Sequence, residues 1–266
     1  MNTNLIDYTL HLADTALILG HRNSEWCGHG PILEQDIAIS NISLDLIGQA
    51  RNFYQYAAQL ATNSHIAESP KAPPLEEFGE VTEDSLAYFR DANEFKNLLL
   101  VEQPKGDWAQ TILRQFFFSA FQYNLYDKLK ESNDHQLSAI AAKALKEVSY
   151  HLRWSSEWVI RLGDGTEESH GRMTAAIESL WSYTDEMFTK AFYETSLIAE
   201  NIIPDTALLK DPWMKKVTEI FDEATLPVPQ TSLVHTGGKI GQHTDHLPTI
   251  LEELQSVARA HPSATW

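Results

Sequence analysis

The sequence contains a single cysteine, Cys27, and therefore cannot form a disulfide within the chain. Such sparse use of cysteine is typical of proteins in a reducing compartment, so we expect a cytoplasmic protein. The first residues, MNTNLIDYTL, show neither the basic start nor the apolar stretch of a secretion signal. No run of about 20 apolar residues occurs, which predicts that no segment crosses a membrane.

Basic residues are also scarce. Lys and Arg number 20 against 37 Asp and Glu, which gives a formal net charge of −17. A surface of that sign repels phosphate groups, so nucleic acid is excluded as an expected partner. The chain also lacks a P-loop, a dinucleotide-binding Gly-x-Gly-x-x-Gly and a nucleophile elbow Gly-x-Ser-x-Gly. The enzyme classes that depend on those motifs gain no support.

Apolar residues are abundant and recur at helical spacing. They make up 43% of the 266 residues, enough for a sizeable core. Recurrence at every third or fourth position predicts helices, and no alternation typical of a strand is present at any length. The predicted helices cover residues 4–21, 31–61, 82–100, 108–131, 136–162, 170–199, a segment that begins at 211–212 and ends before 225, and 247–260. This pattern predicts an all-α, long-helix bundle with additional C-terminal helices.

The same pattern predicts one helical domain over residues 1–266, a length that a single domain can accommodate. Three prolines, Pro70, Pro73 and Pro74, predict that residues 63–81 form a surface loop. Residues 225–246 are rich in Pro and Gly and predict an extended loop before the last helix.

Long helices with scattered carboxylates raise the question of a di-iron site. Helical di-iron proteins use one Glu from each of two helices and a Glu-x-x-His from each of two others. The corresponding positions here are Asp14; Asp45 with Gly48 three residues later; and Glu147 with Tyr150 at +3 and His151 at +4. Glycine has no ligand atom, and the predicted helix between Asp107 and Asp127 contains no carboxylate. We therefore predict a vestigial site, with no metal ligand, catalytic residue or cofactor-binding residue in this chain.

Vestigial carboxylates that are buried need a cation, a hydrogen-bond donor or a raised pKa. Candidate neighbours on the same predicted helices are Arg51, Arg114, Lys143, Tyr150, His151 and Arg153. We expect a polar or ion-paired cluster in the core of the bundle. Glu147 and His151, four residues apart, are also explained as a simple internal polar contact.

Four segments of the sequence are distinctive: EWCGHGPILEQDIAISNISLDLIGQARNFYQYAAQL, FKNLLLVEQPKGDWAQTI, KALKEVSYHLRWSSEWVIRLGDGT and TGGKIGQHTDHLPTILEEL. In these segments the chain resembles the structural (PaaC-type) subunit of the bacterial phenylacetyl-CoA epoxidase complex, a ring-1,2 monooxygenase. The four segments span most of the chain in the expected order.

The resemblance implies a ferritin-like fold and a non-catalytic role. Such a subunit binds and stabilises a homologous partner, which alone holds the di-iron centre. The two form a heterodimer that pairs into a two-plus-two heterotetramer, and a separate reductase delivers electrons from NADPH. The reaction implied is the epoxidation of phenylacetyl-CoA during aerobic phenylacetate degradation.

Two other functions are weighed against this one. A self-sufficient di-iron or di-manganese oxidase with unusual ligands would have to retain metal when purified alone. A helical protein unrelated to oxygenation would not co-elute with a catalytic partner.

Two further segments could serve a partner. RQFFFSAFQYNLY is aromatic around more than one helical face, which indicates either a helix in a large core or a docking surface. The loop TGGKIGQHTDH carries Lys239 and His243, which we predict to contact the partner or the CoA portion of the substrate. The histidines of this loop could suggest a zinc site, but no cysteine lies nearby in the sequence to act as a further ligand. The simpler alternative is an ordered turn before the last helix.

Overall fold

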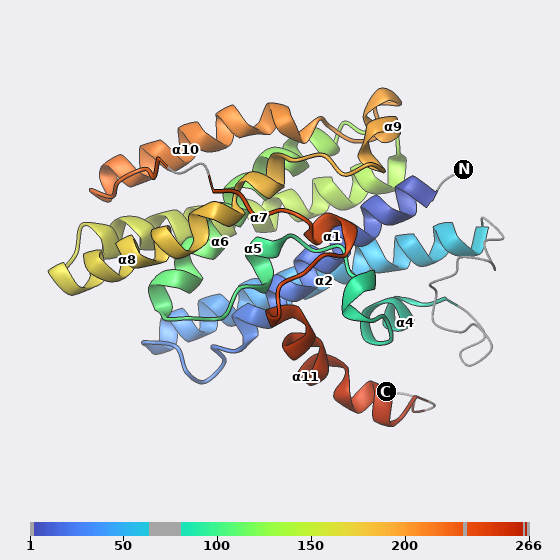
Figure 1. Ribbon diagram of the computed structural model, residues 1–266, viewed down its shortest axis with the longest axis horizontal. Helices are drawn as coiled ribbons and strands as arrows, with labels where there is room; N and C mark the ends of the chain where they lie inside the picture. Colours follow the sequence, from blue (N-terminus) through green and yellow to red (C-terminus); the bar gives the residue numbers. More distant parts are fainter. Residues whose placement is uncertain (1–2, 64–80, 231–232, 263, 265–266) are drawn as a thin grey trace. The chain divides into compact units, whose positions relative to one another are not determined.

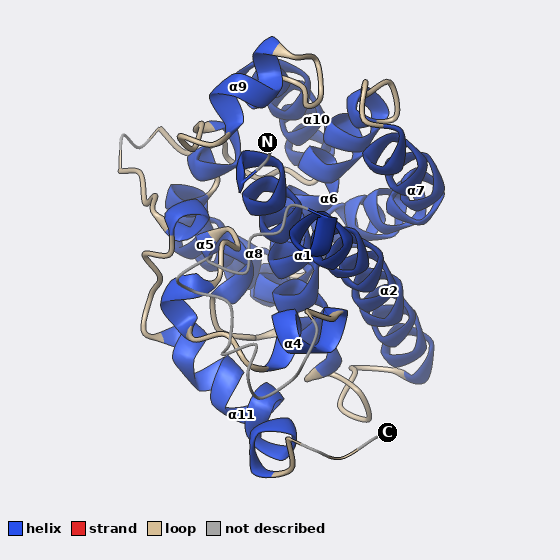
Figure 2. Ribbon diagram, turned by 90° about the vertical axis from the view of Figure 1, so that its right-hand side faces the viewer, coloured by secondary structure: helices blue, strands red, loops and turns tan. Residues whose placement is uncertain are grey.

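The computed structural model describes residues 3–63, 81–230, 233–262 and 264. Helices and connecting loops make up these ranges, and no strand occurs in them (Figure 1, Figure 2). The predicted all-α fold is confirmed. Most of the proline-rich stretch, residues 64–80, lies outside the described residues. Within the described part of the chain, no helix has the length and apolar character needed to span a bilayer.

The chain forms two compact units. Unit 1 comprises Met1–Cys27, Ile37–Gln103 and Gly237–Trp266, and unit 2 comprises Gly28–Asp36 and Pro104–Thr236. The helices of unit 1 are α1 (Thr3–Ser24), α2 (Leu33–Asn63, of which the first turn belongs to unit 2), α4 (Glu83–Tyr88), α5 (Leu99–Glu102) and α11 (His246–Ala260). Those of unit 2 are α6 (Trp108–Leu129), α7 (His135–Gly163), α8 (Glu167–Leu180), α9 (Glu194–Ala199) and α10 (Lys210–Glu223).

In unit 1, α1 and α2 lie side by side and antiparallel (Figure 1). Gly20 of α1 faces the backbone of Ser43, and Asp14 bonds to Tyr54 further along α2. A Cβ at Gly20 would lie 3.2 Å from the Ser43 carbonyl oxygen, so glycine allows the close approach of the two helices. The C-terminal helix α11 packs against α4 and α5.

In unit 2, α6 is the central helix and forms a hairpin with α7. The Trp108 ring at the start of α6 meets the ring of Trp154 edge to face, with centroids 6.1 Å apart. Further along α6, the Phe117 carbonyl accepts a 2.9 Å hydrogen bond from the indole of buried Trp213 on α10. The aromatic residues of α6 that are buried in this way are Phe116, Phe117, Phe118, Phe121 and Tyr126. These side chains form core, whereas Tyr123 is 37% exposed.

Side-chain caps explain where several helices begin. The carboxylate of Asp107 accepts from the Gln110 amide at the start of α6, and Asp134 caps α7 in the same way. Thr82 begins α4 with a reciprocal capping box. Each cap bonds an amide that the first helical turn leaves without a partner.

Two predicted helix lengths are wrong. The predicted helix 82–100 ends at Tyr88 and is followed by a 3-10 turn at Ala92–Glu94 and the short α5. Residues 170–199 are likewise divided, because α8 ends at Leu180 and two 3-10 turns precede α9. In both regions side chains bond backbone amides that a continuous helix would bond itself.

Candidate functional site

The core of unit 1 contains a short non-helical segment, residues 95–98, between the 3-10 turn and α5. Side chains of α1 bond its backbone. The bonds are Lys96 N–H to the Asp14 carboxylate at 2.8 Å, His11 Nδ1 to the Lys96 carbonyl at 2.7 Å, and Leu98 N–H to the Thr15 hydroxyl at 3.3 Å. His11, Asp14 and Thr15 share one face of α1, since they are three and four residues apart. This polar face therefore replaces the helical hydrogen bonds that residues 95–98 lack.

Asp14 is a buried carboxylate with its own cation. Both guanidinium NH groups of Arg90 donate to its two oxygens, and the Tyr54 hydroxyl donates to Oδ1 at 2.5 Å. The Arg90 side chain is only 3% exposed and lies 4.3 Å from the centre of the Phe95 ring. Burial alone would lower the pKa of Arg90, but the Asp14 charge raises it above its usual value. The pair is therefore an ionised, bidentate ion pair inside unit 1.

Tyr54 is part of the same cluster. Burial, followed by the nearby Asp14 charge, raises the pKa of its phenol well above the usual value. The hydroxyl therefore keeps its proton and serves as a donor to Asp14.

Glu102, at the end of α5, is a second buried carboxylate. One oxygen accepts from the Thr244 amide at 2.7 Å and the Thr244 hydroxyl at 2.8 Å. The other accepts from the Asn97 amide group and faces Nδ1 of His243, both at 2.8 Å. These four contacts surround both oxygens of the carboxylate.

His243 provides the cation beside Glu102. Its Nε2 lies 2.9 Å from the Phe95 carbonyl, so both ring nitrogens face oxygen acceptors. Only the imidazolium, with two N–H groups, can donate to both. Burial acts to lower the pKa of His243, but the bond to Glu102 raises it above the ordinary 6.5. Geometry and charge both favour the protonated ring.

The loop that carries His243 is packed into unit 1. Lys239 is only 4% exposed, and burial followed by the Lys239 charge lowers the pKa of His11 to about 3. Gly241 has φ +81°, and a Cβ there would lie 2.2 Å from the Asn93 carbonyl oxygen. The structure thus places both residues singled out from the loop, Lys239 and His243, inside unit 1. Their contact with a partner or CoA stays a prediction.

The predicted vestigial positions of α1 and α2 do not meet. Asp14 lies opposite Tyr54, nine residues from Asp45, which corresponds to about 13 Å along α2. Asp45 is half-buried. Gly48 is exposed, and a Cβ added there would have no atom within 4 Å. Gly48 is therefore on the outer face of α2 and does not mark an inward position that has lost its histidine.

The remaining predicted positions lie on α7 in unit 2. His151 is fully buried, Glu147 is half-buried and Tyr150 is 38% exposed. Burial raises the pKa of the Tyr126 phenol on α6, whereas the hydrogen bond from Gln122 lowers it. The charge of Glu147 raises this pKa further. The Glu147 charge therefore acts on Tyr126, which belongs to a polar stretch of α6 where Gln115 donates to Ser119 and Gln122 donates to Tyr126.

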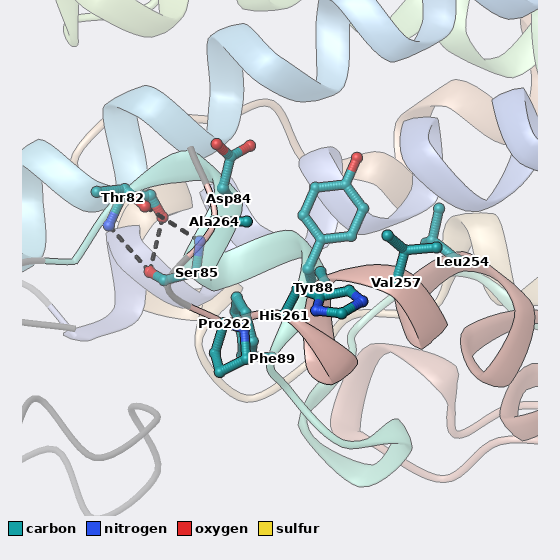
Figure 3. A pocket seen from close by; sticks show the side chains of 11 residues that line it. Thr82, Asp84, Ser85, Tyr88, Phe89, Leu254, Val257, His261, Pro262 and Ala264 are labelled. Carbon is teal, nitrogen blue, oxygen red and sulfur yellow. Dashed lines mark hydrogen bonds between the residues drawn. The ribbon is translucent and has the colours of Figure 1, made fainter. Parts of the chain in front are cut away.

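A groove of about 480 Å³ lies between α4 and the end of α11 (Figure 3). Apolar and aromatic side chains, among them Tyr88, Leu254 and Val257, form much of its lining. The hydroxyls of Thr82 and Ser85 are already bonded within the α4 capping box, as the dashed lines show. Neither Asp14 nor Glu102 lines the groove.

The whole chain, residues 1–266, matches a family model described as "Phenylacetic acid catabolic protein". The chain belongs to the phenylacetic acid catabolic protein family. It is 47% identical over 262 residues to one subunit of the 1,2-phenylacetyl-CoA epoxidase of Escherichia coli (strain K12). That alignment covers 98% of this chain and 99% of the relative. The resemblance inferred from the sequence segments is confirmed.

The carboxylates of this phenylacetic acid catabolic protein do not fit a di-iron centre. Among the residues that the structure describes, no three His, Cys, Asp or Glu side chains are grouped so that they could hold a metal ion. A metal at Asp14 would have to displace Arg90, Tyr54 and the Lys96 amide, and one at Glu102 would have to displace four contacts.

Sequence reasoning missed the partners of both carboxylates in this family member. The residues it did not identify are Tyr54, Arg90, Asn97, Glu102 and Thr244. None of the proposed cations pairs with Asp14, because its partner comes from a broken helix 76 positions away. Arg51 pairs instead with Glu83, and Arg114 donates to the Pro104 carbonyl. The one available signal was Glu102 itself, a charged residue that follows the apolar run LLLV.

Proposed function

We propose that this chain is the non-catalytic structural subunit of a phenylacetyl-CoA epoxidase, which binds and stabilises the di-iron catalytic subunit. The observation that carries the proposal is the Asp14–Arg90 ion pair. A guanidinium neutralises the buried carboxylate of α1, whereas the helix carboxylates of a di-iron bundle are neutralised by the metal that they bind. The similarity to the Escherichia coli epoxidase subunit over nearly the whole chain supports the same role.

The second buried carboxylate supports the proposal independently. Glu102 is neutralised by His243 and bonded by three further donors, so it offers no free oxygen to iron or substrate. Both carboxylates fix residues 95–98 and the loop around residue 243 in unit 1. A subunit built in this way contributes a rigid surface.

In the proposed assembly the homologous partner holds the di-iron centre. This chain forms a heterodimer with it, and two heterodimers pair into a cytoplasmic heterotetramer. A separate reductase passes electrons from NADPH to the partner's irons. The contribution of this chain is to support the partner's ligand helices and to exclude water from one side of the substrate channel.

Co-expression with the di-iron subunit tests this function. We expect the two chains to co-purify and to separate only under denaturing or high-salt conditions, with iron and oxygen-dependent turnover requiring the partner. The partner expressed alone should lose solubility or activity. Retention of iron and turnover by this chain alone would instead support the self-sufficient oxidase, and failure of the chains to associate would refute the proposed role.

A further inference from the structure

One face of α2 carries large aliphatic side chains that the chain leaves exposed. Ile37 and Leu44 are 52% and 66% exposed, and Ile47, at the edge of this face and next to Gly20 of α1, is 41% exposed. At 100° per residue they fall within about 80° of one another, so they form one stripe along the helix. The opposite face of α2 is buried, with Leu46 close to Gly20 of α1. We call the exposed positions Ile37, Asn41, Leu44, Ile47, Gly48 and Arg51 the outer α2 stripe.

Gly48 lies within this stripe, in the interior of a long helix. Glycine destabilises the interior of a helix relative to alanine, so its presence at position 48 needs a structural explanation. The described part of the chain provides none, because a Cβ at Gly48 would have none of its atoms within 4 Å. Gly20 on α1 differs, since a Cβ there would meet the Ser43 carbonyl at 3.2 Å. A glycine that no neighbour among the described residues requires, placed among exposed aliphatic side chains, indicates the close approach of another molecule's backbone.

Charge indicates which molecule that is. A second copy of this chain would bring another net charge of −17 against the first. The outer α2 stripe nevertheless contains no carboxylate, although the chain has 37 Asp and Glu residues. Loss of charge is typical of the core of a protein interface. Its one charged residue, Arg51, pairs with Glu83 within the chain but is 68% exposed at the end of the stripe, so its guanidinium can also meet an acidic group on a different protein.

We propose that the di-iron catalytic subunit packs one of its helices along the outer α2 stripe, with the closest approach of the two backbones at Gly48. This inference rests on the proposed function and assigns the docking face within it. Leu44 and the exposed part of Ile47 fill spaces between side chains of the partner helix, and Arg51, which also contacts Glu83, lies at the rim.

Three variants test the docking face. Gly48→Leu adds volume without charge, and Leu44→Glu places a charge in the centre of the stripe. The matched control, Leu208→Glu, alters a leucine of unit 2 that is 75% exposed, slightly more than Leu44. Each purified variant is titrated against the complex of the catalytic subunit with a tagged, unaltered chain, and the dissociation constant is obtained from the displacement of the tagged chain. Thermal unfolding of each isolated variant checks that it folds.

We expect Gly48→Leu and Leu44→Glu each to weaken binding by at least about 100-fold, while Leu208→Glu stays within about threefold of the unaltered chain. Gly48→Leu should also raise the unfolding temperature of the isolated chain by about 2 °C, because leucine favours helix and meets no clash. Loss of binding together with unchanged or increased stability separates docking from misfolding.

Different results would refute the docking face and the proposed function. If the unaltered chain binds the catalytic subunit and both stripe variants bind equally well, the docking face is wrong and the proposed function stands. If the unaltered chain does not bind, the proposed function itself fails. Equal loss of binding in Leu208→Glu would also refute the assignment to α2.

Discussion

Replacing Arg90 by methionine tests whether the buried ion pair is needed for the fold. The change keeps a long side chain but removes the cation that faces both oxygens of Asp14. The carboxylate is fully buried, with 0% of its side chain exposed, so it would be left without a counter-charge. Removing one partner of a buried ion pair typically costs about 3–5 kcal/mol. The variant also loses the bonds from Arg90 to the Leu86 and Glu94 carbonyls, which places the expected cost at the upper end.

The assay is thermal and urea unfolding followed by circular dichroism. At about 2–4 °C per kcal/mol for a chain of this size, Arg90→Met should lower the unfolding temperature by about 10 °C or more. The double variant Asp14→Asn, Arg90→Met removes both charges and should recover part of the loss, so the two single effects should not add. A loss below about 1 kcal/mol for Arg90→Met, or strict additivity, would refute the role assigned to the pair.

Three further predictions follow from the loop and the helix caps. The pKa of His243 is raised above 6.5 in the folded chain, so its stabilising effect should be complete below pH 6.5 and be lost as the pH rises through the raised value. Unfolding temperatures measured between pH 6 and 9 should therefore fall more steeply for the unaltered chain than for His243→Gln, and parallel profiles would contradict this. Gly241→Ala should cost at least about 2 kcal/mol, because a positive φ and a contact with the Asn93 carbonyl both oppose a Cβ; urea unfolding without a shifted midpoint would disprove it. Asp107→Ala should cost about 1 kcal/mol by removing the cap on the Gln110 amide, whereas Asp107→Ser should largely preserve stability in the same assay.

Long helices could be predicted because their signal is local. Apolar spacing predicted residues 4–21 and 136–162, and the structure has α1 over Thr3–Ser24 and α7 over His135–Gly163. The prediction of one continuous helix over residues 82–100 was wrong, because the contacts that interrupt the helix come from residues far away in the sequence. Residues 95–98 are fixed by side chains of α1 more than eighty positions earlier. The helical propensity of residues 95–98 depends only on the local sequence and cannot reveal those long-range hydrogen bonds.

The partners of the buried charged residues could not be predicted from the local sequence either. A carboxylate on an apolar helix predicts that Asp14 needs a partner, but only the fold identifies that partner as Arg90. Gly48 follows Asp45 by three residues, which is the position of the histidine in a Glu-x-x-His metal-binding pair. The spacing does not say which side of the helix is inside. The buried residues of α2, such as Leu46 and Phe53, place Gly48 on the other face.

The most direct test of the central claim is the iron content of this chain alone. The purified chain is incubated anaerobically with ferrous iron, passed through a desalting column and measured for metal per polypeptide, with the di-iron subunit treated in parallel. Because Arg90 and His243 already neutralise Asp14 and Glu102, we predict less than about 0.1 iron per chain beside close to two in the catalytic subunit. Two tightly held irons in the isolated chain would contradict the account.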